Sequence, residues 1–171
     1  MKGIKTLVSA GSFALCLGAA SLASAATIGP AGTLFTTPGG NITVKSPSSF
    51  QAAVTCDIEF KGRVNSDGTA TIYDATVSGS NPLCGLPKMK GFPTPGWVLS
   101  LDTNPDGTVT KGTVTNVGYT ISFIPATNCG PTNIDVTWDG TALHATSQPL
   151  SGSCTVVSLN ATPSPALTVT P

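Results

Sequence analysis

The sequence predicts an all-β protein, an antiparallel β-sandwich or a partly open barrel, stapled by two disulfides. Three observations support this prediction. Apolar and polar residues alternate over several short segments, turn-forming residues separate these segments, and 19 glycines with 14 prolines among 171 residues argue against long helices. We favour the sandwich, because two staples within one chain suit two packed sheets.

The N-terminal segment has the features of a removable export signal. A short positive start precedes an uncharged run of apolar and small residues at positions 7–22, and Ala23-Ser24-Ala25 supplies the small side chains that a signal peptidase needs. We expect residues 1–25 to be a signal peptide and residues 26–171 to be a single secreted β domain. The run is too short, and too rich in glycine and serine, for a transmembrane segment of about 20 apolar residues, and no later stretch is better suited.

Three segments alternate clearly enough to be predicted as strands. Every second residue is apolar in each, so one face is buried and the other is wet. The apolar positions are Val54, Cys56, Ile58 and Phe60; Val117, Tyr119, Ile121 and Phe123; and Ile134, Val136 and Trp138. Hairpin turns are expected at residues 65–68 and at Asp139-Gly140. Leu167 and Val169 stand at strand spacing near the end of the chain and predict a last edge strand.

Four cysteines follow the predicted signal peptide: Cys56, Cys84, Cys129 and Cys154. An even count in an exported chain indicates two disulfides, and three pairings are possible. We expect the nearest-neighbour pairs Cys56–Cys84 and Cys129–Cys154, which close two short loops. A metal site is disfavoured, because no CxxC or Cys/His spacing occurs.

The remaining composition argues against several functional classes. Charged residues make up only 9% of the chain, with eight basic and eight acidic side chains, and no basic patch recommends a nucleic acid partner. The one histidine, His144, lies in a predicted strand, and no GxSxG motif is present. We therefore expect a protein that is not an enzyme and uses no cofactor.

One segment resembles part of a calcium loop. Residues 102–107 match the first half of an EF-hand, with oxygen-bearing side chains at positions one, three and five and glycine at six. Position twelve is Thr113 where a glutamate is needed, and the flanking pattern is that of strands. A tight turn is favoured over calcium binding, because Pro105 and Gly107 are typical turn residues.

The segment from Pro82 to Trp97 breaks the alternation. It contains four prolines and five large apolar residues, Leu83, Leu86, Met89, Phe92 and Trp97. Long irregular loops of this kind are often functional. These side chains are our candidate contact surface for hydrocarbon, with Lys88 and Lys90 keeping their charges in water. The competing interpretation is that they fold back and cap the core.

The chain resembles the alkane oxidation protein activator family of pseudomonads, the PraA/PraB type, over nearly its whole length. The resemblance is carried by residues 15–20 (LCLGAA), 40–47 (GNITVKSP), 78–87 (SGSNPLCGLP), 151–156 (SGSCTV) and 166–171 (ALTVTP). It implies a secreted, non-enzymatic accessory factor that promotes emulsification and uptake of long-chain alkanes, with the oil–water interface as partner. The alternative function is a structural protein of the cell surface or biofilm matrix that self-associates through strand edges.

Overall fold

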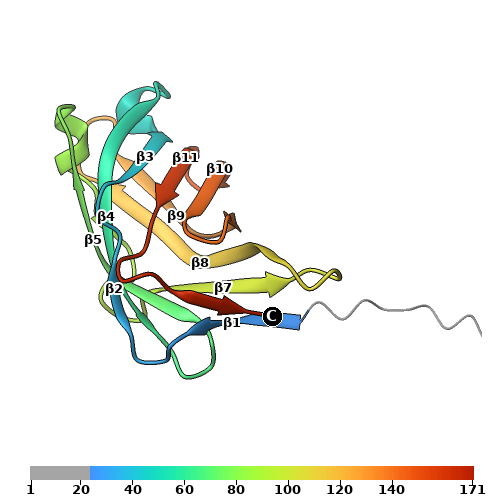
Figure 1. Cartoon of the computed structure of the whole chain (residues 1–171). Helices are drawn as coiled ribbons and strands as arrows, with labels where there is room; N and C mark the ends of the chain where they lie inside the picture. Colours follow the sequence, from blue (N-terminus) through green and yellow to red (C-terminus); the bar gives the residue numbers. More distant parts are fainter. Residues whose placement is uncertain (1–23) are drawn as a thin grey trace, which may run out of the picture.

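The computed structural model describes residues 24–171 (Figure 1). The predicted signal peptide lies outside the described residues, apart from Ser24 and Ala25 at the start of the first strand. The first elements are β1 (Ser24–Gly29), β2 (Leu34–Thr36), β3 (Gly40–Lys45), the 3-10 helix η1 (Pro47–Ser49), β4 (Val54–Val64), β5 (Ala70–Ser78) and the 3-10 helix η2 (Pro82–Gly85). The next are β6 (Lys88–Met89), β7 (Trp97–Thr103), β8 (Val109–Ile121), β9 (Thr127–Trp138), β10 (Leu143–Leu150), β11 (Cys154–Ala161) and β12 (Thr168–Thr170).

Eight of these strands form a closed antiparallel barrel. Hydrogen-bonded neighbours follow the order β7-β5-β4-β3-β11-β10-β9-β8, and β7 pairs with β8 to complete the ring. The structure therefore confirms the barrel alternative and not the sandwich. The barrel is closed, whereas the sequence predicted a partly open one. Alternation of apolar and polar residues is the same in both architectures. The difference lies in one pairing, between residues 98–103 and 109–115, which joins what would otherwise be two sheet edges.

Four short strands extend this ring. Two barrel strands each pair with two partners along one edge: β4 pairs with β3 through its first half and with β2 through its second half. In the same way β7 pairs with β5 and then with β1, which in turn pairs with β12. The last strand is thus an edge strand, as the spacing of Leu167 and Val169 predicts. The fourth addition, β6, pairs with β8.

Inward-facing side chains of the barrel strands form one main core, and a smaller cluster of Val54, Cys56 and Cys84 lies around the first disulfide. Cys56, Ile58 and Phe60 are buried, which confirms the alternation predicted for β4, and the same holds for the apolar face of β9. The prediction for β8 is right for three of its four residues. Phe123 is wrong, because β8 ends at Ile121 and Phe123 is exposed in the loop that follows.

Three hairpin turns of similar sequence lie at one end of the barrel, which we call the turn end. Residues 65–71 and 104–110 both read Asn-x-Asp-Gly-Thr-x-Thr. In each the aspartate accepts hydrogen bonds from the backbone N–H and the hydroxyl of the threonine two residues on. Asp139 does the same with Thr141. The segment that resembles a calcium loop is therefore built as a hairpin turn, the interpretation favoured by its Pro105 and Gly107.

The packing of Phe35 predicts a sharp response at Gly62. A Cβ at Gly62 would clash with the edge of the Phe35 ring of neighbouring β2. Replacing Gly62 by alanine should lower the free energy of unfolding by about 1–3 kcal/mol, because a buried ring must shift. Urea denaturation of Gly62→Ala measures this, and Gly85→Ala, where a Cβ meets nothing within 4 Å, is the control. Equal stabilities of the two variants would contradict the packing.

Candidate functional site

Four loops make up the other end of the barrel, which we call the stapled end. They are residues 46–53 between β3 and β4, 79–96 between β5 and β7, 122–126 between β8 and β9, and 151–153 between β10 and β11. The loops that contain η1 and η2 lie together at the top of Figure 1, away from the C-terminus. Both disulfides are at this end.

One disulfide ties the loop 79–96 to the barrel wall, and the other joins two strands of the wall. Cys56 of β4 is bonded to Cys84 of η2, and Cys129 of β9 is bonded to Cys154 of β11. These are the nearest-neighbour pairs expected from the sequence. The first bridge closes a loop with a sequence separation of 28 and the second one of 25. Each restricts the unfolded chain and should contribute about 3–4 kcal/mol to stability.

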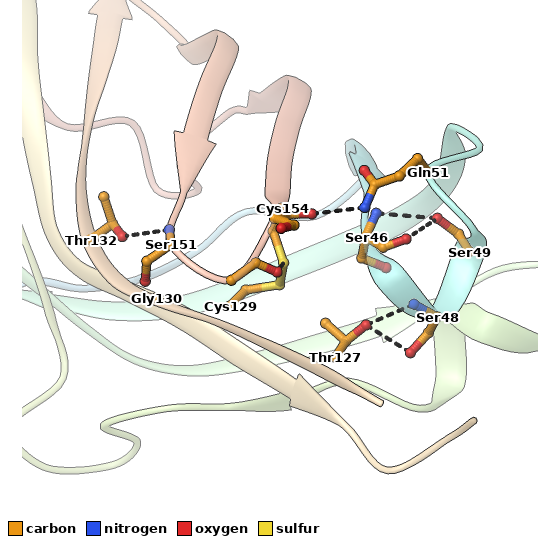
Figure 2. Close-up of a disulfide and its surroundings, with 12 residues drawn as sticks. Ser46, Ser48, Ser49, Gln51, Thr127, Cys129, Gly130, Thr132, Ser151 and Cys154 are labelled. Carbon is orange, nitrogen blue, oxygen red and sulfur yellow. Dashed lines mark hydrogen bonds between the residues drawn. A yellow bond between two sulfur atoms is a disulfide. The ribbon is translucent and has the colours of Figure 1, made fainter. Parts of the chain in front are cut away.

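Hydrogen bonds then join the η1 loop to the β8–β9 loop (Figure 2). The Ser48 hydroxyl donates to the Pro125 carbonyl at 2.8 Å. The Thr127 hydroxyl accepts from the Ser48 N–H at 2.9 Å and lies 2.7 Å from Ser48 Oγ. Because Ser48 and Thr127 are buried, this polar contact is shielded from water and holds the two loops in one arrangement.

Ser46 and Ser49 order the same loop from within. The Ser49 hydroxyl accepts from the Ser46 N–H at 3.2 Å and donates to the Ala52 carbonyl at 2.7 Å. The Gln51 amide reaches across to the Ser153 carbonyl at 3.0 Å, beside the Cys129–Cys154 bridge (Figure 2). Of the five buried polar residues in the described part of the chain, four belong to this network: Ser46, Ser48, Ser49 and Thr127.

This network presents Phe50 to solvent. Phe50 has φ 52° and ψ 36°, a left-handed conformation that costs a bulky residue of order 1 kcal/mol or more. Its N–H donates to the Pro47 carbonyl at 2.9 Å, and the Gln51 N–H donates to the Ser46 carbonyl at 3.0 Å. The side chain is 77% exposed. An apolar ring is thus held in water by a strained backbone, and such strain is typical of functional positions.

Other large apolar side chains are exposed at the same end. Ile124 is 90% exposed, and Phe123 and Leu86 are exposed on the neighbouring loops. Residues 24–171 contain five exposed large apolar residues, and four of them lie here: Phe50, Leu86, Phe123 and Ile124. We call these four the tip residues. The fifth, Leu34, is on β2, near the turn end.

The contact residues predicted from the sequence have a different arrangement. Trp97 is a core residue of β7, and its indole N–H donates to the Lys90 carbonyl at 2.9 Å. Phe92 packs on Trp97 with ring centroids 4.7 Å apart, and Met89 forms part of β6; both are half-buried against the core. Leu83 packs beside the Cys56–Cys84 bridge. Only Leu86 of the five is exposed.

The capping interpretation therefore describes most of the segment from Pro82 to Trp97, which also contains a short strand that the sequence pattern missed. Lys90 is half-buried, and its ammonium donates to the Gly130 carbonyl of β9. The segment folds back against the barrel because burial of the Trp97 and Phe92 rings gains more free energy than ordering the loop costs.

Substitution of Met89 and Phe92 by serine should accordingly unfold the protein more easily. Both side chains pack against the core, and serine removes apolar contacts and adds a hydroxyl. We expect the pair to lower the free energy of unfolding by roughly 2–4 kcal/mol. Thermal denaturation followed by circular dichroism checks this, with Leu86→Ser as the matched exposed control. An unchanged melting temperature in the double variant would mean that the segment does not cap the core.

The barrel interior is not completely filled. A cavity of about 90 Å³ lies among the core side chains, and its lining is mostly apolar but includes Thr37, Ser46, Ser49 and Tyr119. At roughly 24 cal/mol per Å³, such a void costs about 2 kcal/mol of stability. An eight-stranded barrel is just wide enough either to be filled by side chains or to hold one small ligand, so the void is a second candidate site.

The single histidine of the sequence is paired with an aspartate. His144 Nε2 lies 2.9 Å from Asp139 Oδ2 at the exposed β9–β10 turn. This hydrogen bond, with those from Thr141 and Ala142, holds the pKa of the Asp139 carboxyl well below its usual range. In residues 24–171, no three His, Cys, Asp or Glu side chains come together as metal ligands. No helix in that range has the length and apolar character to cross a bilayer.

The sequence pattern missed most of the tip residues. Ser46 followed by Pro47 is a helix-start signal, and it could have placed η1. Phe123 continued the alternation of β8, so nothing local marked it as exposed. Ile124 precedes Pro125, which indicates a turn but does not say whether the side chain is buried.

Comparison with known proteins gives one match. The family model described as alkane oxidation protein activator PraA/PraB-like matches residues 1–171, which is the whole chain. No curated protein and no solved structure matches. The chain belongs to the PraA/PraB-like family of alkane oxidation protein activators.

Proposed function

We propose that this protein is an exported, non-enzymatic accessory factor that promotes alkane assimilation by attaching to the hydrocarbon surface through its tip residues. The observation that carries the proposal is Phe50, an aromatic ring exposed at positive φ above a buried polar network. The family name supplies alkane oxidation as the process. In this proposal the tip residues contact the hydrocarbon in place of the residues expected from the segment 82–97. Leu86 belongs to both sets.

The physical argument rests on where apolar and polar side chains lie on the surface. An emulsifier needs an apolar patch on a stable body that is otherwise wetted. Transfer of each exposed Phe, Leu or Ile side chain from water to oil contributes up to about 1.5–3 kcal/mol. Lys88, beside the tips on β6, is exposed and can keep its charge in water while its stem lies along the oil.

Export is part of the proposal. It is supported by the signal-like residues 1–25 and by two disulfides, which persist in oxidising compartments. On this view the mature protein is the single domain 26–171. Self-association through strand edges is the alternative function, but closure of the barrel leaves only short strands such as β12 and β6 unpaired on one side.

Interfacial tension at a hexadecane–water boundary tests the proposal. Purified mature protein should lower the tension while sedimenting as a monomer. A protein that sediments as polymers and leaves the tension unchanged would refute the proposal and favour the structural alternative.

A further inference from the structure

The barrel wall is incompletely paired between β9 and β10. Within residues 24–171, these strands share only two backbone pairs, both next to the turn that joins them: Trp138 with Leu143, and Thr137 with His144. Beyond these pairs, residues 131–136 of β9 lie opposite residues 145–150 of β10 without a ladder pair. We call this stretch the seam. Each side of the seam is as long as an ordinary short strand.

The seam is closed again at the stapled end. The Gly130 N–H donates to the Ser151 carbonyl at 3.0 Å, and the Ser151 N–H donates to the Thr132 hydroxyl at 3.1 Å (Figure 2). The Cys129–Cys154 bridge links β9 to β11 beside these bonds. The two edges of the seam are therefore held together at both of its ends.

The side-chain amide of Gln148 lies between the two edges. Its oxygen accepts from the Asp135 N–H at 2.9 Å, and its nitrogen donates to the Thr146 carbonyl at 3.0 Å. Continuation of the β9–β10 register would place Asp135 opposite Thr146, and these two backbone groups would then bond directly. A primary amide offers the same C=O and N–H groups as a peptide unit. Gln148 therefore fills the position that a peptide group of an intervening strand would occupy.

The backbone of β10 keeps the seam from closing on itself. Ser147 has φ 54°, a left-handed conformation that is unfavourable for a residue other than glycine. Pro149 has no N–H and cannot donate to a ladder. Both residues lie next to Gln148 in the sequence, so the interruption is built into this strand.

We infer that the seam is an acceptor site for a short extended segment of another polypeptide, which displaces the Gln148 amide and pairs with the edges of β9 and β10. In recognition by strand addition, backbone hydrogen bonds supply affinity and alternate side chains supply specificity. The site is separate from the tip residues and does not involve hydrocarbon.

The chemistry of the seam restricts the segment that fits. Asp135 is the only charged residue in residues 131–136 and 145–150, so a neutral or basic segment is favoured over an acidic one. Ile134 and Leu150, one on each side of the seam, line the barrel cavity of about 90 Å³. Side chains that point inward must therefore be small and apolar, and those that alternate with them face water.

The experiment is an amide NMR titration of the full mature protein with the synthetic peptide Lys-Lys-Thr-Val-Thr-Val-Thr-Lys-Lys. We expect saturable shifts of the amides in residues 131–137 and 144–150. The same peptide with proline in place of both valines should not bind, because proline removes the N–H donors.

Variants at position 148 test the displacement. Gln148→Ala removes the competing amide, so the peptide should bind about tenfold more tightly than to the wild type. Gln148→Met keeps the length of the side chain without its hydrogen bonds. It should behave in the same way, and it keeps the test open if Gln148→Ala does not fold.

Several outcomes would overturn the inference. They are no saturable shift in the wild type or the folded variants, equal binding of the proline peptide, binding by the variants no tighter than by the wild type, and shifts centred on β1 and β12. Oligomers of the protein alone, with the seam amides protected from exchange, would assign the seam to a second copy instead. Replacing Phe50 and Ile124 by asparagine should leave peptide binding unchanged, so this site and the proposed surface function can each fail alone.

Discussion

Replacing Phe50 and Ile124 together by asparagine should remove most of the surface activity and leave the fold intact. These are the two most exposed tip residues, at 77% and 90%. Each loses up to about 1.5–3 kcal/mol of transfer free energy, which corresponds to about tenfold or more in the protein concentration needed. Drop-shape tensiometry at a hexadecane–water boundary measures the concentration for half-maximal lowering of the tension.

The thermal stability of this double variant should rise or stay the same. Asparagine tolerates the left-handed conformation better than phenylalanine, so the backbone at φ 52° is relieved at position 50. The melting temperature of the variant should equal or exceed that of the wild type. A large fall in melting temperature would mean that Phe50 is a packing residue rather than a contact residue.

Leu34 offers a matched control on the same molecule. It is 61% exposed, but it lies on β2 near the turn end. Leu34→Asn removes a comparable apolar side chain and should leave the interfacial tension curve unchanged. If Leu34→Asn weakens the activity as much as the tip substitutions, then the activity is spread over the whole surface and the stapled end has no special role.

The strands of this protein are predictable because their signals are local. Alternation at residues 54–60 and 134–138 reflects one buried face, and Asp-Gly at position 139 fixes a hairpin turn. The disulfide pairs are also predictable, because short loops between neighbouring cysteines are the easiest to close. In each case the information lies within a few residues or a single loop.

The closure of the barrel is not predictable in the same way. A sandwich and a barrel share the same alternating strands, and they differ here in the pairing of β7 with β8. That pairing depends on how far the whole sheet coils before its edges meet, which no short segment encodes. The staples did not decide the question either, since both disulfides join elements at one end of the ring.

The burial of most of the candidate contact residues was not predictable for a related reason. Large apolar residues between prolines suggested an exposed loop at 82–97, but hydrophobicity alone does not say whether a loop side chain reaches a core. Trp97 begins a barrel strand, and the Phe92 ring packs against the Trp97 ring. Phe50, in contrast, follows two serines in the sequence, and nothing local shows that the Ser48–Thr127 contact across the fold holds this loop with the Phe50 ring outside.

Removal of the Cys129–Cys154 disulfide should destabilise the protein and also disorganise the tips. Cys129 is fully buried, so the pair is best replaced by alanine, which avoids a buried hydroxyl. With a sequence separation of 25, loss of the bridge should cost about 3–4 kcal/mol, a fall of roughly 10 °C in melting temperature. Differential scanning calorimetry of Cys129→Ala/Cys154→Ala measures the fall.

The Cys56–Cys84 bridge is the matched comparison, because its sequence separation of 28 predicts nearly the same loss of stability. The two variants should differ in surface activity. Cys154 follows Ser153, whose carbonyl accepts from Gln51 next to Phe50, whereas Cys84 anchors η2 and only Leu86 among the tips. Below both melting temperatures, the Cys129→Ala/Cys154→Ala variant should therefore require more protein to lower the interfacial tension than the Cys56→Ala/Cys84→Ala variant. The reverse order would place the main hydrocarbon contact on the η2 loop, and equal activity of both variants with the wild type would show that the disulfides stabilise the barrel without positioning the tips.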